Sequence, residues 1–183
     1  MEVKFDGKRA LVTGAGRGIG HALAKALLKC GAEVFALSLI QEELDSLVQE
    51  VCIQISIHPV QCDLADPEAT KAAVESVGPI DLLVNNAGII ILESFLDVTL
   101  DAFDKVMNVN IRVNTVNPTV VMTDMGRMAW SDPAKSGPML ARIPLGKFVE
   151  VDNVVHAILF LLSDKAAMVN GIILPIEGGF LTS

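Results

Sequence analysis

The stretch Thr13-Gly14-Ala15-Gly16-Arg17-Gly18-Ile19-Gly20 is a glycine-rich turn that separates two segments with different hydropathy patterns. Before it, Arg9 to Thr13 is a short apolar run of the kind that forms a buried strand. After it, Gly18 to Cys30 has the spacing of an amphipathic helix, and Gly31 is placed to end that helix. Strand, glycine turn and helix in this order indicate the start of a parallel α/β sheet.

The glycines of this turn suit the binding of a phosphate group. Gly14 and Gly18 permit a positive φ or a close backbone approach, and Gly20 lets the helix pack tightly on the sheet. The N–H groups near Gly18 and Ile19, at the start of the helix, then point at a bound pyrophosphate. The pattern predicts a dinucleotide site, and the alternative is a glycine-rich turn that binds no ligand.

Apolar and amphipathic runs continue to alternate after this turn, which is typical of strand–helix units in a parallel sheet. The further strands that we predict are Glu33 to Ser38, Ile55 to Cys62, Ile80 to Val84, Arg112 to Val116 and Ile172 to Ile176. The predicted helices are Gln41 to Val51, Pro67 to Val77 with Asp66 as N-cap, Thr99 to Asn108, and Phe148 to Leu162. A Met-rich segment with several Pro residues, ending at about Leu145, predicts a long loop with short helical pieces. The predicted fold class is α/β: a Rossmann-like, doubly wound parallel sheet in one domain over residues 1–183.

Composition limits the class of protein. The 183 residues are 51% hydrophobic and 20% charged, which is too apolar for a disordered chain and sufficient for one core. The net charge of -8 repels phosphate polyanions, so no nucleic-acid partner is expected. Cys30, Cys52 and Cys62 lack the spacing and the His neighbours of a metal site, and they fit free thiols in a reducing compartment. Because we find no secretory leader and no transmembrane segment, we expect a cytoplasmic protein.

The end of the second predicted strand, Leu37-Ser38-Leu39-Ile40, bears on which dinucleotide binds. An acidic residue at this place holds the ribose 2'-hydroxyl of NAD, whereas a nearby cation accepts the 2'-phosphate of NADP. These four residues include no acid, and Arg17 in the glycine turn can hold a phosphate with two hydrogen bonds. The sequence therefore favours NADP(H), and the alternative for Arg17 is a solvated surface side chain.

Four motifs together indicate a family. They are residues 13–20, Cys62-Asp63-Leu64, Asn85-Asn86-Ala87-Gly88 and Asn108-Val109-Asn110. Together they resemble the short-chain dehydrogenase/reductase family, and the resemblance runs nearly end to end. It implies an NADP-dependent oxidoreductase that reduces a dicarbonyl or a sugar by hydride transfer, and it implies a homotetramer.

The resemblance also implies roles for single residues. Asp63 would hold the adenine edge, Asn86 and Gly88 would line the cofactor ribose, and Thr123 would lie near the nicotinamide amide or the pyrophosphate. Alternatively, Asp63 caps a turn and the Asn pair satisfies buried backbone groups at a strand end. No metal ligand is predicted. The predicted cofactor residues are Gly14, Gly16, Arg17, Gly18, Ile19, Gly20, Ser38, Leu39, Asp63, Asn86, Ala87, Gly88, Pro118, Val121 and Thr123.

The catalytic group of the family consists of an Asn, a Ser, a Tyr and a Lys, and only the Asn, as Asn110, has a match in this chain. In the family the Tyr protonates the carbonyl oxygen as hydride arrives at carbon, and this sequence contains no Tyr. The three imidazoles, His21, His58 and His156, are far apart in the predicted order and are expected in surface or core roles.

The junction between Asn110 and Ile111 is where the resemblance breaks. By the family pattern, two strand–helix units, roughly sixty residues, are missing at this point. The predicted elements on either side are separated by three apolar or amide residues without a turn signal. We therefore expect a catalytically impaired or inactive chain. The alternatives are a non-catalytic NADP-binding or subunit-association module, or an unstable deletion product.

Overall fold

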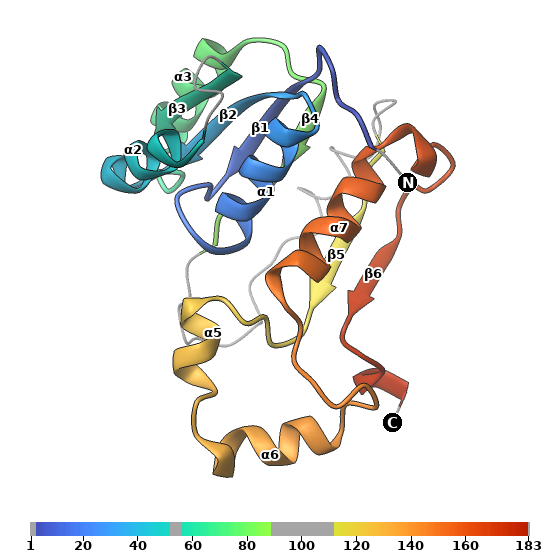
Figure 1. Cartoon of the computed structure of the whole chain (residues 1–183). Helices are drawn as coiled ribbons and strands as arrows, with labels where there is room; N and C mark the ends of the chain where they lie inside the picture. The colour runs from blue at the N-terminus through green and yellow to red at the C-terminus, as the bar shows by residue number, and fades with distance from the viewer. Residues whose placement is uncertain (1–2, 52–55, 89–111, 183) are drawn as a thin grey trace.

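The computed structural model describes residues 3–51, 56–88 and 112–182 (Figure 1). Four parallel strands form the main sheet in the order β3-β2-β1-β4. Because the chain builds β2 and β3 on one side of β1 and then places β4 on the other side, the order reverses between β1 and β4. In sheets of this kind the ligand binds at the carboxyl ends of the strands at such a reversal. The strands are β1 (Arg9–Thr13), β2 (Glu33–Ser38), β3 (Ile57–Gln61) and β4 (Leu82–Val84).

Helices cover both faces of this sheet. On one face, α1 (Gly18–Lys29), α2 (Gln41–Glu50) and α7 (Val151–Leu162) share a single apolar cluster with the strands. On the other face, α3 (Pro67–Val77) packs on a smaller cluster around Leu11 and Phe35. The alternation of side chains along each strand separates the two clusters. The arrangement is the predicted Rossmann-like fold.

Two further strands form a second, separate sheet. β5 (Thr115–Pro118) and β6 (Ile173–Ile176) pair in parallel. α7 joins this pair to the main sheet, because it contacts β5 and packs against α1 through the buried Val155 (Figure 1). Within the described residues β4 pairs only with β1, and β5 only with β6, so the sheet is incomplete.

Apolar side chains are exposed on strands of both sheets, on either side of this break. Leu83 of β4 stands opposite Leu11 of β1 in the register, yet half of its surface is exposed whereas Leu11 is buried. Ile173 of β6 is 67% exposed. In a complete doubly wound sheet a helix layer covers such positions. Exposed apolar groups on a sheet face are therefore a direct consequence of the incomplete sheet.

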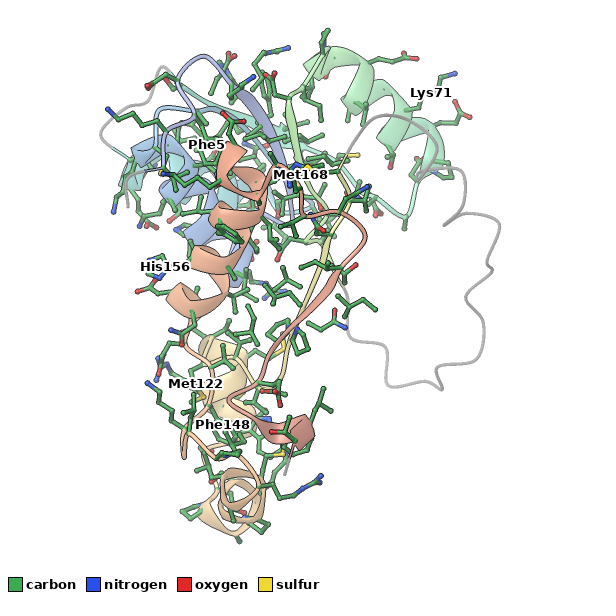
Figure 2. The ribbon with its side chains drawn as sticks, turned by 90° about the vertical axis from the view of Figure 1, so that its right-hand side faces the viewer. Phe5, Lys71, Met122, Phe148, His156 and Met168 are labelled. Carbon is green, nitrogen blue, oxygen red and sulfur yellow. The ribbon has the colours of Figure 1, made fainter. Side chains whose placement is uncertain are left out.

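The predicted Met-rich loop contains two helices, α5 (Asp124–Ala129) and α6 (Pro133–Ala141). They lie beyond the carboxyl end of β5 (Figure 1), and Met122 lies just before α5 (Figure 2). Asp132 caps α6 with its side chain, followed by Pro133 at the first helical position. The expectation of short helical pieces is confirmed here.

The strand predicted at Arg112 to Val116 begins later than expected, at Thr115. The guanidinium of Arg112 donates to the carbonyl oxygens of Leu161, Leu162 and Ser163 at the end of α7. Asn114 also bonds through its side chain, to Val169 and Ile172. These residues approach the α7–β6 connection with their side chains, so the backbone ladder starts only after them.

Other element boundaries differ by smaller amounts. The last predicted helix begins at Val151 rather than at Phe148, because Glu150 and Asn153 form a capping box there. Val149 just before the helix bridges to Val121 in parallel, which holds this segment extended. The remaining strands and helices match the prediction within two residues at either end, and the predicted helix Thr99 to Asn108 lies outside the described residues. In the described part of the chain, no helix is long and apolar enough to cross a membrane.

α1 and α2 are also joined by an ionic contact. Glu50 Oε2 lies 2.7 Å from Lys25 Nζ and 3.0 Å from His21 Nε2. The hydrogen bonds from Lys25 and His21 lower the pKa of the Glu50 carboxyl to about 2. Because the folded pKa lies below the unfolded one, the contact stabilises the fold above about pH 4.5, and this stabilisation is lost as the pH falls toward about 2.

We expect Glu50→Gln to reduce the loss of stability between about pH 6 and about pH 3. Glu50 is 42% exposed, so solvent screens the contact and the difference between the variants should be under about 1 kcal/mol. Urea unfolding of both proteins at the two pH values measures it. Glu75→Gln, an exposed carboxylate on α3, is the control. If the free energy of unfolding falls equally in the wild type and in Glu50→Gln between the two pH values, the prediction is contradicted.

Candidate cofactor-binding site

The glycine turn lies where β1 meets α1, at the reversal of strand order. Gly14 and Gly18 have φ values of 64° and 60°, a conformation that side chains other than glycine rarely adopt. A Cβ added at Gly14 would lie 2.7 Å from Ala87 Cα, and one at Gly20 would lie 2.5 Å from Asn86 Nδ2. Glycines are therefore required because the turn and the start of α1 lie directly against the loop after β4.

A set of hydrogen bonds fastens these two loops together. Asn86 Nδ2 donates to the carbonyl oxygens of Thr13 (3.0 Å) and Gly14 (3.2 Å). The backbone N–H groups of Asn86 and Ala87 both donate to Thr13 Oγ1 at 3.0 Å, and this hydroxyl donates to the carbonyl of Val84. These hydrogen bonds agree with the interpretation in which Asn86 satisfies backbone groups at a strand end. Contact of Asn86 with a cofactor stays a prediction.

The N-terminus of α1 is open to an anion. Arg17 occupies the N-cap position but its side chain makes no capping hydrogen bond, and the first turn holds no acidic residue. The first N–H groups of a helix have no partner within the helix, and together with the helix dipole they attract negative charge. Thr123, the N-cap of α5, comes close to this turn, since a Cβ at Gly18 would lie 3.6 Å from Thr123 Cγ2. Gly18, Ile19 and Thr123 are thus brought together around one point.

The other end of the turn lies beside the end of β2. Ser38 is buried, and its Oγ would lie 2.8 Å from a Cβ at Gly16. The carboxylate of Glu43, from the first turn of α2, lies against the same point of Gly16. Leu39 is 58% exposed. Gly16, Ser38 and Glu43 therefore meet at one place, next to an exposed Leu39.

Arg17 lies beside Glu43. Its Nε lies 3.8 Å from Glu43 Oε1, and its side chain is 75% exposed. Glu43 was not among the predicted cofactor residues, because it lies in the helix after β2 and not at the end of the strand, where the acid is expected. The available signal was an acid about 20 residues after the glycine turn. The helix start after β2 turns Glu43 back to the glycine turn, which the strand pattern alone does not indicate.

The remaining predicted residues are more dispersed. Asp63 follows β3, is exposed, and accepts a hydrogen bond from the Ala65 N–H at 2.9 Å, as in the turn-capping interpretation. Pro118 ends β5, and Val121 bridges to Val149. A cofactor role for each of these residues, and for Gly88, stays a prediction.

Two further polar residues, Asn110 and Thr119, bear on catalysis and ligand binding. Asn110 lies outside the described residues. Thr119 Oγ1, next to Pro118 at the end of β5, is buried, and no partner for it occurs among the residues that the structure describes. A buried hydroxyl of this kind is suited to a ligand contact.

The three imidazoles lie on different elements. His21 Nδ1 is 3.1 Å from the Gly16 carbonyl oxygen, under the glycine turn, and its other nitrogen faces Glu50. His58 bonds to Glu33 and stacks on Phe35. His156 is exposed and points outward from α7 (Figure 2). The expected surface and structural surroundings are those that the structure shows.

Comparison with protein families decides the affiliation. The family model described as short chain dehydrogenase matches residues 8–112, which is more than half of the chain. The chain belongs to the short-chain dehydrogenase family. A second model, described as enoyl-(acyl carrier protein) reductase, matches residues 108–181. The two matches meet at residues 108–112, around the junction between Asn110 and Ile111.

Curated relatives of this short-chain dehydrogenase chain cover its whole length. It is 44% identical to D-erythrulose reductase of Gallus gallus over 246 aligned positions, covering 100% of the chain and 99% of the relative. It is 43% identical to L-xylulose reductase of Homo sapiens over 244 positions, covering 98% and 99%. Because the chain has 183 residues, each alignment contains about 60 positions more than the chain can fill.

A solved structure shows the same fold. A protein assigned as a 2-deoxy-D-gluconate 3-dehydrogenase of Agrobacterium tumefaciens, with bound NADP, superimposes with a TM-score of 0.76. It is 25% identical, and the superposition covers 98% of both chains. The NADP bound in this structure and the match to the short chain dehydrogenase model support the use of a nicotinamide dinucleotide, which agrees with the glycine turn described above.

We expect Asn86→Asp to destabilise the chain by at least about 2 kcal/mol. The substitution replaces an N–H donor by a carboxylate oxygen opposite the carbonyl oxygens of Thr13 and Gly14. Urea unfolding measures the change. The exposed neighbour Asn85→Asp has the same chemistry and should change stability by less than about 0.5 kcal/mol. Equal effects of the two substitutions would show that the loops are not fastened by Asn86.

Proposed function

We propose that this chain is an NADP(H)-binding short-chain dehydrogenase that holds the cofactor but does not turn over a carbonyl substrate by itself. The observation that carries the proposal is the open N-terminus of α1, with the glycine turn held against the Asn86 loop at the strand reversal. This arrangement provides a preformed site for a pyrophosphate. The sequence provides no Tyr.

The residues present fit a dinucleotide. The N–H groups of Gly18 and Ile19 would hold the pyrophosphate, with the Thr123 side chain beside them. Arg17 is exposed enough to reach a 2'-phosphate, and the bound NADP of a structural neighbour supports this choice of cofactor. When bound, NADPH supplies a hydride to a carbonyl carbon.

The substrate class follows from the named relatives. D-erythrulose and L-xylulose are both keto sugars, so a small ketose or dicarbonyl is the substrate that we assign to the complete family members. Reduction of a ketone also needs an acid that protonates the oxygen. The family's Tyr has no counterpart here, His58 is engaged with Glu33, and His156 points outward from α7. Catalysis by this chain is therefore proposed to be impaired.

The absence of a catalytic Tyr goes together with a gap in the fold. We propose that two strand–helix units are absent between Asn110 and Ile111, within one domain. The alignments with about 60 extra positions support this, as does the meeting of two family models at residues 108–112. The unpaired β4 and β5 edges among the described residues also support it, because an absent strand would pair there. The family's homotetramer, which depends on helices at this place in the resemblance, is not proposed for this chain.

The cytoplasmic location stays a prediction. Cys30 and Cys62 are unpaired thiols, and burial raises the pKa of the Cys30 thiol, so it stays protonated and little reactive. Free thiols fit a reducing compartment.

We expect NADPH to stabilise the purified chain without being oxidised in the presence of L-xylulose or diacetyl. At a concentration about 100 times the dissociation constant, the cofactor should add about 2.7 kcal/mol to the free energy of unfolding. Urea unfolding with and without NADPH measures the binding, and absorbance of NADPH over time measures turnover. Sustained oxidation by a preparation free of other reductases would contradict the proposed loss of catalysis.

A matched pair of variants tests the position of the site. Gly18→Asp adds a carboxylate where the pyrophosphate would bind, so it should abolish the stabilisation by NADPH. Gly7→Asp is the control, because Gly7 has a similar φ of 71° and open space around it, remote from this turn. Equal NADPH binding by both variants would place the cofactor away from this turn.

A further inference from the structure

Glu43 is an acid that lies against the glycine turn in the site described above. It belongs to the first turn of α2, yet its carboxylate lies against Gly16, beside the buried Ser38 at the end of β2. Its side chain is only 25% exposed, whereas its neighbour Glu42 is exposed. The two adjacent acids of one helix turn therefore have different surroundings, and only Glu43 faces the turn that would hold a dinucleotide.

The same carboxylate holds the cation of the site. Arg17 Nε and Glu43 Oε1 are 3.8 Å apart, so in the ligand-free chain the guanidinium lies toward Glu43. A 2'-phosphate that binds Arg17 must compete with this carboxylate for the same positive charge. It also brings a second group of like charge beside Glu43, which is unfavourable at short range. A ribose 2'-hydroxyl has neither disadvantage, because it can donate a hydrogen bond to a carboxylate.

We propose that Glu43 is a specificity-determining residue that sets the choice between NADPH and NADH. This inference rests on the proposed dinucleotide binding. Glu43 weakens the binding of the 2'-phosphate by holding Arg17 and by its own charge, and it strengthens the binding of the unphosphorylated ribose by accepting its 2'-hydroxyl. The chain thereby discriminates weakly between the two dinucleotides, although Arg17 alone would favour NADPH.

A structural role for Glu43 makes a different prediction. Acidic side chains in a first helical turn stabilise the helix through its dipole, and α2 carries two of them, Glu42 and Glu43. If Glu43 acted only in this way, neutralising Glu43 would have the same effect as neutralising Glu42. Both substitutions would then change the NADPH and NADH affinities by the same factor. The ratio of the two affinities separates the roles, because a helix-dipole contribution does not depend on the ligand's 2' substituent.

The test measures dissociation constants of NADPH and NADH by calorimetry for the wild type, Glu43→Gln and Glu42→Gln. Glu43→Gln should bind NADPH about tenfold more tightly and NADH about threefold more weakly. Glu42→Gln should keep the NADPH to NADH ratio within about twofold of the wild type. Arg17→Gln, which leaves α2 unchanged, should weaken the binding of NADPH about tenfold more than the binding of NADH. Urea unfolding of each variant without ligand confirms that it is folded.

The outcomes separate the inference from the proposed function. Binding of a dinucleotide by the wild type, with the same affinity ratio in Glu43→Gln, overturns the inference and leaves the proposed function standing. An equal shift of the ratio in Glu42→Gln also overturns it, because a general loss of charge would then suffice. If the wild type binds neither NADPH nor NADH, both the proposed function and the inference fail. If Glu43→Gln does not fold, the Arg17→Gln variant still tests the inference. The inference is overturned if its ratio of NADPH to NADH affinity equals that of the wild type.

Discussion

The contact between Asn86 and the β1–α1 turn is the constraint on which the site depends. A side-chain amide here satisfies two backbone carbonyls, of Thr13 and Gly14, and Thr13 Oγ1 satisfies two N–H groups in return. Buried backbone groups without partners are costly, so the two loops stay together. Close approach of these loops leaves no room for a Cβ at Gly14 or Gly20. The requirement for glycine at these two positions is thus the result of packing between the two loops.

The second determinant of the molecule is the join between its two sheets. Within the described residues no ladder connects β4 to β5, so the connection relies on side-chain packing of α7 against α1 and β5. Arg112 reinforces it by bonding the last carbonyls of α7. Apolar packing is not directional and tolerates a gap in the sheet, whereas strand pairing does not. The exposed Leu83 of β4 lies on one edge strand of that gap.

Local pattern predicted most of the first half of the chain. The strands Arg9–Thr13 and Glu33–Ser38 and the helix Pro67–Val77 have the predicted bounds, because each combines an apolar period with a Gly, Pro or Asp signal at its end. β5 was misplaced because Arg112 and Asn114 bond with their side chains to residues 49 and 55 positions away in the sequence. Glu43 was missed for the same reason, since its neighbour Gly16 is distant in sequence.

The amino-acid sequence by itself determined the fold class, the phosphate-binding turn, the family resemblance and the absence of Tyr, because each depends on residue types in short stretches. Only the tertiary structure decided that Glu43 reaches the glycine turn, that Asn86 bonds to β1, and that β5 and β6 stand apart from the main sheet. These features result from contacts between residues far apart along the chain. Such contacts depend on how helices and strands pack, which local spacing does not specify.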